Sequence, residues 1–108
     1  GRLWLATEKG VIKITNGIST AYPGNPGLAV SEDKIGRIWV GTHREGLKLF
    51  DEKADRFISF VHDPKNPKSI AENEVACLLQ SPDGNTLQIA TRKGISLMPL
   101  NRVGEFTN

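Results

Sequence analysis

The stretch that decides the fold is GRIWVGT at positions 36–42, followed three residues later by GLKLFD at positions 46–51. Ile38 and Val40 fall on one face of an extended chain and Trp39 on the other, which is the period-2 pattern of a β-strand. Gly46 follows the short connection 43–45, and a hairpin loop of this length commonly needs a left-handed backbone there. The stretch therefore predicts a β-hairpin.

The same unit occurs twice more in the chain. Near the start it is GRLWLAT at 1–7 with GVIKI at 10–14, and near the end it is GNTLQIAT at 84–91 with GISLM at 94–98. Three copies of a hairpin within 108 residues identify a repeat protein. The repeat bears on architecture and carries no catalytic chemistry by itself, so function has to be sought elsewhere in the sequence.

The segments between the hairpins predict further strands. We expect these strands at 18–22, 28–31, 56–61 and 74–80, with the start of another at 105–107. Irregular loops rich in proline and glycine are expected at 23–27 and 62–69. A helix over 71–80 is the alternative for the fourth strand. The strand is preferred because 28–31 occupies the same place in the preceding unit.

The repeat unit thus has four antiparallel strands. Thr7 and Thr42 lie about 35 residues apart and Thr42 and Thr91 about 49, near the ~40–50 residues of known propeller repeats. The predicted fold class is all-β, a partial β-propeller in which one complete four-stranded antiparallel blade is flanked by two incomplete ones. Blade boundaries are expected at roughly 1–27, 28–69 and 70–108. A regular propeller needs about four to eight blades to close, so we expect a piece of a longer protein with open ends.

Composition excludes several classes of function. The net charge of +2 is too small for a nucleic-acid binder, which would show a concentrated basic stripe. The single cysteine, Cys77, lies in an apolar run and is expected to be a small buried side chain. No metal-ligand cluster and no cofactor motif is visible, and no apolar run is long enough to span a bilayer.

Several runs resemble the two-component regulator propeller repeat. They are the Trp-containing strand with its Gly-Leu hairpin at 36–51, the HDPKNPKSI loop at 62–70 and the SPDGN turn at 81–85. That repeat is found in periplasmic sensor regions of hybrid two-component systems of Bacteroides-like bacteria, which commonly sense oligosaccharides. The resemblance implies a periplasmic location and a parent chain that carries a histidine kinase. The third copy departs from the pattern, because Gln88 stands where the repeat has a tryptophan. The repeat motif belongs to the scaffold and identifies no ligand residue.

Most candidate chemical residues have a structural explanation. Trp4 and Trp39 could stack on sugars, but their fixed mid-strand place favours packing between blades. The aspartates at turns could suggest paired carboxylates for glycoside cleavage, but aspartate in a turn usually accepts hydrogen bonds from its own backbone. These turn aspartates are Asp33, Asp51, Asp63 and Asp83. We therefore assign no catalytic residue.

The order of the strands separates two sets of loops. In a four-stranded meander, the loop between the second and third strands lies at the same end as the loop that leads to the next blade. Mixed to basic residues gather at this end, and mainly acidic residues gather at the other. Because loops carry function more often than the scaffold, we expect the first end to bind a ligand through Arg44, Arg92 and Lys93, with His43 beside them. Guanidinium groups form directed hydrogen bonds to sugar hydroxyls and carboxylates.

The sequence thus favours a ligand-sensing, oligosaccharide-binding fragment of a hybrid two-component sensor, with no enzymatic activity in this fragment. One alternative is an interaction scaffold that dimerises and binds no small ligand, with self-association through open blade edges. The other alternative is a piece of a propeller lyase or glycosidase.

Overall fold

The described part of the chain is all-β. The computed structural model describes residues 2–23 and 27–108, and these contain ten strands and no helix. The strands are β1 (Arg2–Thr7), β2 (Gly10–Thr15), β3 (Ile18–Pro23), β4 (Ala29–Glu32), β5 (Ile38–Gly41), β6 (Leu47–Asp51), β7 (Arg56–Phe60), β8 (Val75–Gln80), β9 (Thr86–Thr91) and β10 (Gly94–Pro99). The strand expected near 74–80 is therefore confirmed over the helical alternative.

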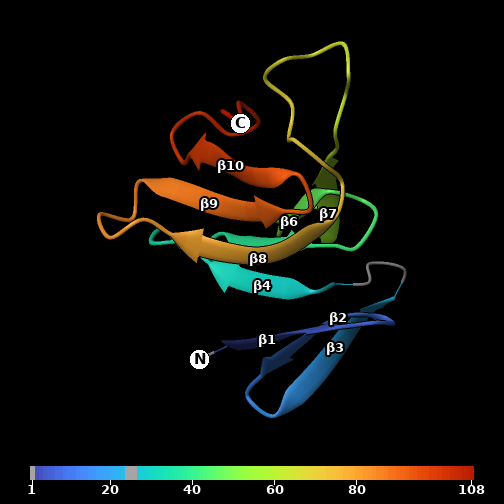
Figure 1. The fold of residues 1–108 in the computed structure, drawn as a ribbon. Helices are drawn as coiled ribbons and strands as arrows, with labels where there is room; N and C mark the ends of the chain where they lie inside the picture. The colour runs from blue at the N-terminus through green and yellow to red at the C-terminus, as the bar shows by residue number, and fades with distance from the viewer. Residues whose placement is uncertain (1, 24–26) are drawn as a thin grey trace.

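The strands form three antiparallel sheets (Figure 1). The central sheet has the order β4-β5-β6-β7, the first sheet has the order β1-β2-β3, and the third sheet has the order β10-β9-β8. One four-stranded sheet is thus flanked by two three-stranded ones, which is consistent with a partial propeller-like fold. The strand expected at 105–107 is present only as a single bridge between Leu97 and Thr107.

The turns are formed by the residues that the sequence indicates. Asn16 and Gly17 connect β2 to β3 with φ of 51° and 79°, the left-handed pair expected of an Asn-Gly hairpin turn. Gly46 closes the β5–β6 loop with φ of 76°. A Cβ atom at Gly46 would lie 2.2 Å from the carbonyl oxygen of Phe60, so both the conformation and the space require glycine. Most of the loop expected at 23–27 lies outside the described residues.

Two hydrophobic cores lie between the sheets. Between the first and central sheets, Trp4, Val11 and Tyr22 pack against Ile38, Val40 and Phe50. Between the central and third sheets, Trp39 and Leu47 pack against a mainly aliphatic set. That set comprises Ile70, Val75, Leu87, Ile89, Met98, Leu100 and Phe106. Both tryptophans are buried, as their packing role predicts.

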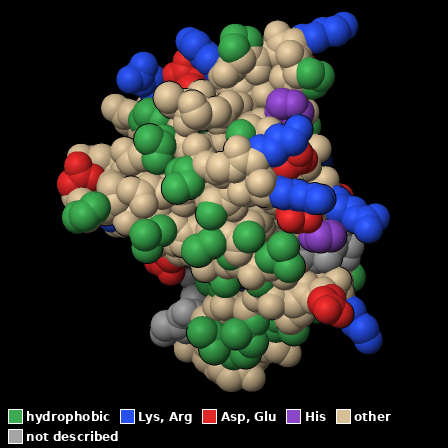
Figure 2. Space-filling view, in the orientation of Figure 1, with side chains coloured by type: hydrophobic (Ala, Val, Ile, Leu, Met, Phe, Trp, Pro, Cys, Tyr) green, Lys and Arg blue, Asp and Glu red, His purple; other side chains and the backbone are tan. Residues whose placement is uncertain are grey.

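The outer faces of the end sheets remain open. In the third sheet, the register places Cys77 beside Ala90 and Ile95, and Leu79 beside Gln88 and Leu97. Hydrophobic side chains are visible over β8 and β9 in Figure 2. Cys77 is exposed on this face, so the expectation that it is buried is wrong. A bulge between Val75 and Cys77 sets the alternation of β8, and none of the described elements covers the face to which Cys77 belongs.

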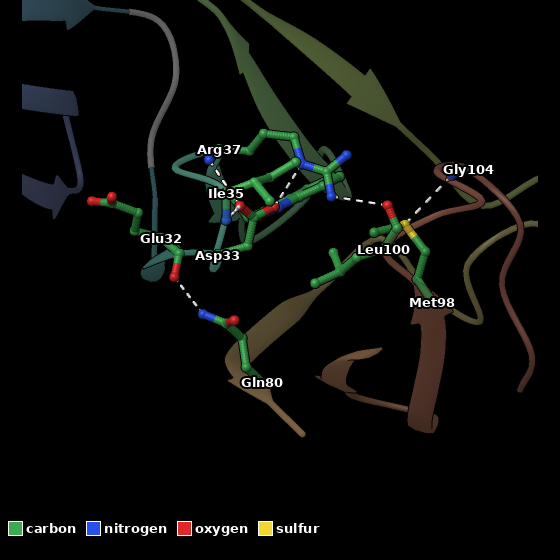
Figure 3. A network of polar contacts seen from close by, with 9 residues as sticks. Glu32, Asp33, Ile35, Arg37, Gln80, Met98, Leu100 and Gly104 are labelled. Carbon is green, nitrogen blue, oxygen red and sulfur yellow. Dashed lines mark hydrogen bonds and ion pairs between the residues drawn. The ribbon is translucent and has the colours of Figure 1, made fainter. Parts of the chain in front are cut away.

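A polar network ties the central sheet to the third sheet (Figure 3). The Asp33 side chain is fully buried and accepts hydrogen bonds from the backbone N–H groups of Ile35 and Arg37 and from the Arg37 Nε atom. Arg37 Nη2 donates to the carbonyl of Leu100 at 2.9 Å, and Gln80 donates to the carbonyl of Glu32. The network fixes the turn between β4 and β5 against its neighbour.

Candidate functional site

Antiparallel strand order gathers two different sets of connections at the two ends of the molecule. One end, here called the loop end, comprises 7–10, 42–46, 62–74 and 91–94, and it lies to the right in Figure 1. The opposite end, the turn end, comprises 32–37, 52–55 and 81–85. In Figure 2 the right-hand side carries histidine, lysine and arginine side chains interspersed with acidic ones. The loop end is thus a densely charged surface of both signs.

A threonine closes each hairpin loop at the loop end. Thr42 Oγ1 donates to the carbonyl of Gly46 at 2.8 Å, and Thr91 Oγ1 donates to the carbonyl of Gly94 at 2.8 Å. Thr7 Oγ1 makes the same bond to the carbonyl of Gly10. The loop residues between each threonine and glycine are therefore held at their base by the scaffold, while their side chains project outward.

The segment 72–75 joins the loops of the central and third sheets. Its backbone accepts a hydrogen bond from Gly46 N at the Asn73 carbonyl, 2.9 Å, and another from Arg92 N at the Glu74 carbonyl, 3.3 Å. Val75 N donates to the carbonyl of Thr42 at 2.8 Å. These bonds bring the β5–β6 loop and the β9–β10 loop to the same short piece of chain.

Acidic side chains of this segment contact a histidine of one loop and a lysine of the other. Glu74 Oε1 lies 3.2 Å from His43 Nδ1, and Glu72 Oε2 lies 3.7 Å from Lys93 Nζ. The pKa of the Glu72 carboxyl is lowered, first by the hydrogen bond that it accepts from Asn73 N and then by the Lys93 and His62 charges. Glu72 is therefore a carboxylate acceptor throughout the neutral range.

A cavity of about 580 Å³ opens between the first and central sheets at the loop end. Its lining combines carboxylates, a guanidinium, an imidazole and an aliphatic side chain, from Glu8, Gly27, Leu28, His43, Arg44 and Glu45. The carboxylate of Glu45 is also 3.3 Å from the ammonium of Lys48, whose side chain is only 7% exposed. Hydrogen-bond donors and acceptors thus face one space beside an apolar wall, an arrangement suited to polyhydroxylated molecules.

The four residues predicted to bind a ligand fall into two groups. His43 and Arg44 line the cavity. Arg92 and Lys93 lie on the β9–β10 loop, outside that lining, and reach the same neighbourhood through Glu74 and Glu72. The loop end therefore contains all four residues, but the cavity contains only two of them.

Sequence reasoning missed the joining role of Glu72 and Glu74. The two acids flank Asn73: Glu74 is the first residue of the strand expected at 74–80, and Glu72 lies two residues before it. Their alternation is the one sequence signal that marked them, since alternate residues of an extended segment project to the same side.

The turn end offers different chemistry. Its aspartates are occupied by local bonds, because Asp51 accepts from Lys53 N and Asp83 accepts from Asn85 N. At the loop end, Asp63 is occupied in the same way and accepts from Lys65 N. Asp33 is saturated as described above. Across residues 2–23 and 27–108, no group of three or more histidine, cysteine, aspartate or glutamate side chains could hold a metal ion.

Comparisons with known proteins bear on the whole chain. No protein-family model matches the sequence, and no curated protein matches it. Among solved structures it is similar to the extracellular domain of BT3049 from B. thetaiotaomicron, described as a hybrid two component system, with a TM-score of 0.87 and 28% identity. This match covers 100% of the present chain and 17% of that chain.

A second solved structure is similar in fold. It is the extracellular domain of BT4673 from B. thetaiotaomicron, described as a one component system, with a TM-score of 0.78 and 20% identity. The match covers 90% of the present chain and 14% of that chain. The chain thus spans a small part of both domains. None of the described residues forms a helix with the length and apolarity needed to cross a membrane.

Proposed function

We propose that the chain is an extracytoplasmic, non-enzymatic sensor fragment of a two-component system and that its loop end binds an oligosaccharide. The three sheets correspond to three units of a β-propeller, at roughly 1–27, 28–69 and 70–108. The parent chain passes the binding signal to a histidine kinase. The similarity to the extracellular domain of a hybrid two component system, at 28% identity, supports the location and the system class.

The observation that carries the binding proposal is the cavity between the first and central sheets. Glu8 and Glu45 supply acceptors, Arg44 supplies directed donors, and Leu28 supplies an apolar wall. Sugars present hydroxyl groups on their edges and C–H groups on their faces, so they match a lining of this kind. Arg92 and Lys93 lie on a separate loop, between β9 and β10, and extend the polar surface toward the third sheet.

The test is a binding titration of the 108-residue chain against a panel of neutral and acidic oligosaccharides, followed by NMR. We expect chemical-shift changes at 43–45 and 91–94, and a loss of affinity of at least tenfold in the variant Arg44→Ala/Arg92→Ala. The matched control is Arg56→Ala, which removes an exposed arginine from the turn end. Equal affinity in both variants, or shifts confined to the turn end, contradicts the proposed site.

A second candidate function is an interaction scaffold, and the open sheet faces favour it. The third sheet exposes Leu79 and Ile95 by 62% and 63%, and the first sheet exposes Leu3 by 54%. In the repeat, these outer faces correspond to the faces that pack against each other inside the molecule. A second copy of the chain, placed with its first sheet on the third sheet, would bury both faces.

Light scattering across concentration tests this scaffold function. Stacking of copies predicts a molar mass that rises with concentration above the 11.8 kDa of the monomer. The variant Leu79→Lys/Ile95→Lys should abolish the rise, whereas Ile35→Lys, at the turn end, should preserve it. A constant monomer mass in the wild-type chain would rule the scaffold out while leaving the sugar titration unaffected.

A further inference from the structure

A second cavity lies at the turn end, between the central and third sheets, and has a volume of about 510 Å³. It is bounded by the turn that precedes β5, by the start of β9 and by the chain that leaves β10. Two cations and two side-chain amides line this cavity, together with an apolar wall. The cations are Lys34 and Arg37, the amides are Asn85 and Asn101, and the wall includes Ile35 and Pro99.

The carboxylate in this lining, Asp33, has no capacity left for a ligand. Its Oδ1 atom accepts from the backbone N–H groups of Ile35 and Arg37, at 3.1 and 2.9 Å. Its Oδ2 atom accepts from Arg37 Nε at 2.6 Å and from Trp39 Nε1 at 3.0 Å. A carboxylate offers about four acceptor positions, and these donors fill them. Asp33 therefore orients the Arg37 side chain and takes no part in binding within the cavity.

Two neighbouring acids are directed elsewhere. In Figure 3 the Glu32 side chain points away from the Arg37 guanidinium. The Asp83 carboxylate accepts from Ser81 Oγ at 2.6 Å and from Asn85 N at 2.9 Å, and Asp83 is not part of the cavity lining. Across the described part of the chain, the cavity is thus lined by cationic and amide donors and by no carboxylate with a vacant acceptor position.

The Arg37 guanidinium is fixed in place and still has N–H groups to donate. Its bonds from Nε to Asp33 and from Nη2 to the Leu100 carbonyl, 2.9 Å, set the plane of the group. Its Nη1 group has no hydrogen-bond partner among the described residues, and 26% of the side chain is exposed. Lys34 Nζ donates one N–H group to Asn85 Oδ1 and has two more. Donors that are already ordered bind a ligand at a lower entropic cost.

We propose that this cavity binds a small organic molecule through a carboxylate group of that molecule. The carboxylate accepts hydrogen bonds from Arg37 Nη1 and Lys34 Nζ, and the body of the molecule packs against Ile35 and Pro99. Hydrogen bonds from a charged donor to a carboxylate are stronger than those to a neutral hydroxyl. The site is separate from the proposed oligosaccharide site at the loop end, so each can fail without the other.

An NMR titration of the chain, in a buffer without competing anions, tests the site. Two matched pairs of probes differ only in the carboxylate, namely galacturonate with galactose and N-acetylleucine with N-acetylleucinamide. Molecules of this size bind with dissociation constants on the order of 1 mM. We expect chemical-shift changes at 34–37, 85–86 and 100–101 with at least one carboxylate, and at least tenfold weaker binding of its neutral counterpart. The Arg37 Nε–H signal should move in the same titration.

The two pairs distinguish the possible sources of the carboxylate. Binding of galacturonate alone identifies a sugar acid, and binding of N-acetylleucine alone identifies an acylated amino acid. Binding of both supports a site that recognises the carboxylate with either body. Equal affinity for a carboxylate and its neutral counterpart, or for inorganic phosphate, overturns the assignment of the carboxylate.

Variants of exposed residues test the lining without disturbing the buried network. Lys34→Ala removes one of the two cations, and Asn101→Asp adds a like charge, so each should weaken binding of the carboxylate at least threefold. The matched control is Lys53→Ala, which removes an exposed lysine of the turn end from outside the cavity and should leave the affinity unchanged. Equal affinities of Lys34→Ala and Lys53→Ala overturn the site. Shift changes confined to the loop end, or their absence at about 20 mM of both carboxylates, also overturn it.

Discussion

The two interfaces between the sheets are built from the same repeat but are held together differently. Between the first and central sheets, four aromatic rings meet, and Trp4 lies 5.0 Å from Phe50 between ring centroids. The Lys13 ammonium lies 5.7 to 5.9 Å from three of the ring centroids, within cation–π range. Between the central and third sheets, the core is mainly aliphatic and polar bonds cross the interface at both ends.

The same repeat can therefore pack its sheets with either aromatic or aliphatic side chains. An aromatic cluster contributes large buried areas and ring-to-ring contacts of about 0.5–1.5 kcal/mol each beyond burial. An aliphatic core contributes burial alone, which does not orient the two sheets. Here the hydrogen bonds from Val75 to Thr42 and from Arg37 to Leu100 fix how the central and third sheets are oriented. The two solutions should respond differently to substitution.

The largest expected effect separates the two tryptophans. Trp39→Ala should lower the free energy of unfolding by about 3–5 kcal/mol, because it leaves a cavity in the fully buried core and removes the hydrogen bond from Trp39 Nε1 to the Asp33 carboxylate. Trp4→Ala should cost about 1 kcal/mol less, since Trp4 Nε1 has no hydrogen bond to lose. Urea unfolding of both variants measures the difference. Equal costs would mean that the two interfaces are equivalent after all.

The next effect concerns Asp33. Asp33→Asn should cost about 1–3 kcal/mol at pH 7, because the amide oxygen cannot accept all the donors and the Arg37 guanidinium loses its counter-charge. Asp83→Asn is the control, since Asp83 occupies an exposed turn of the same kind. If Asp33→Asn costs no more than the control, the Asp33 network does not stabilise this interface.

The same residue predicts a pH dependence. Burial opposes ionisation of Asp33, but hydrogen bonds from Trp39 and Arg37 outweigh it and hold the pKa of this carboxyl below its usual value. The unfolded chain, with an aspartate pKa of about 3.9, therefore binds the proton first as the pH falls. The stabilisation is complete above about pH 4 and is lost as the pH drops through the folded-state pKa. Stability curves from pH 2 to 7 should be flatter for Asp33→Asn than for the wild-type chain.

The smallest effect lies at the rim of the aromatic interface. Tyr22 Oη donates to Asp55 Oδ1 at 2.8 Å, and Tyr22→Phe should cost about 0.5–1.5 kcal/mol. Burial first, and then the bond to Asp55, raises the pKa of Tyr22. This stabilisation is therefore present below about pH 10 and declines as the pH rises further. The cycle with Asp55→Asn checks the pair: additive costs would show that the two residues do not interact.

Much of the scaffold could be predicted because the same hairpin pattern occurs three times in the sequence. The alternation of Ile38, Trp39 and Val40 predicts a strand, and the glycine after each short loop predicts the hairpin. The exposure of Cys77 could not be predicted, because an apolar run has the same sequence pattern whether its sheet face is covered or open. The bulge beside it also shifts the alternation, and no residue of 75–77 signals it.

The candidate site was predictable only in outline. Strand order alone places Arg44 and Arg92 at the same end of the molecule, and the structure agrees. Which of them borders a cavity depends on the gap between the first and central sheets, and the gap between sheets leaves no pattern in the sequence. The joining role of Glu72 and Glu74 depends on contacts with loops about 20 to 30 residues away in sequence, and local patterns do not show which distant residues such side chains contact.

The threonine that closes each hairpin loop has a consequence for how recognition can change. Thr7, Thr42 and Thr91 fix the base of each loop through the same bond to a glycine carbonyl. The two or three residues between each threonine and glycine have exposed side chains, so most of them can be exchanged without disturbing the frame. Glu45, which contacts Lys48 of β6, is the exception. Each hairpin is in this sense a cassette, and a lineage could diversify what it recognises by rewriting the cassettes while inheriting the frame intact.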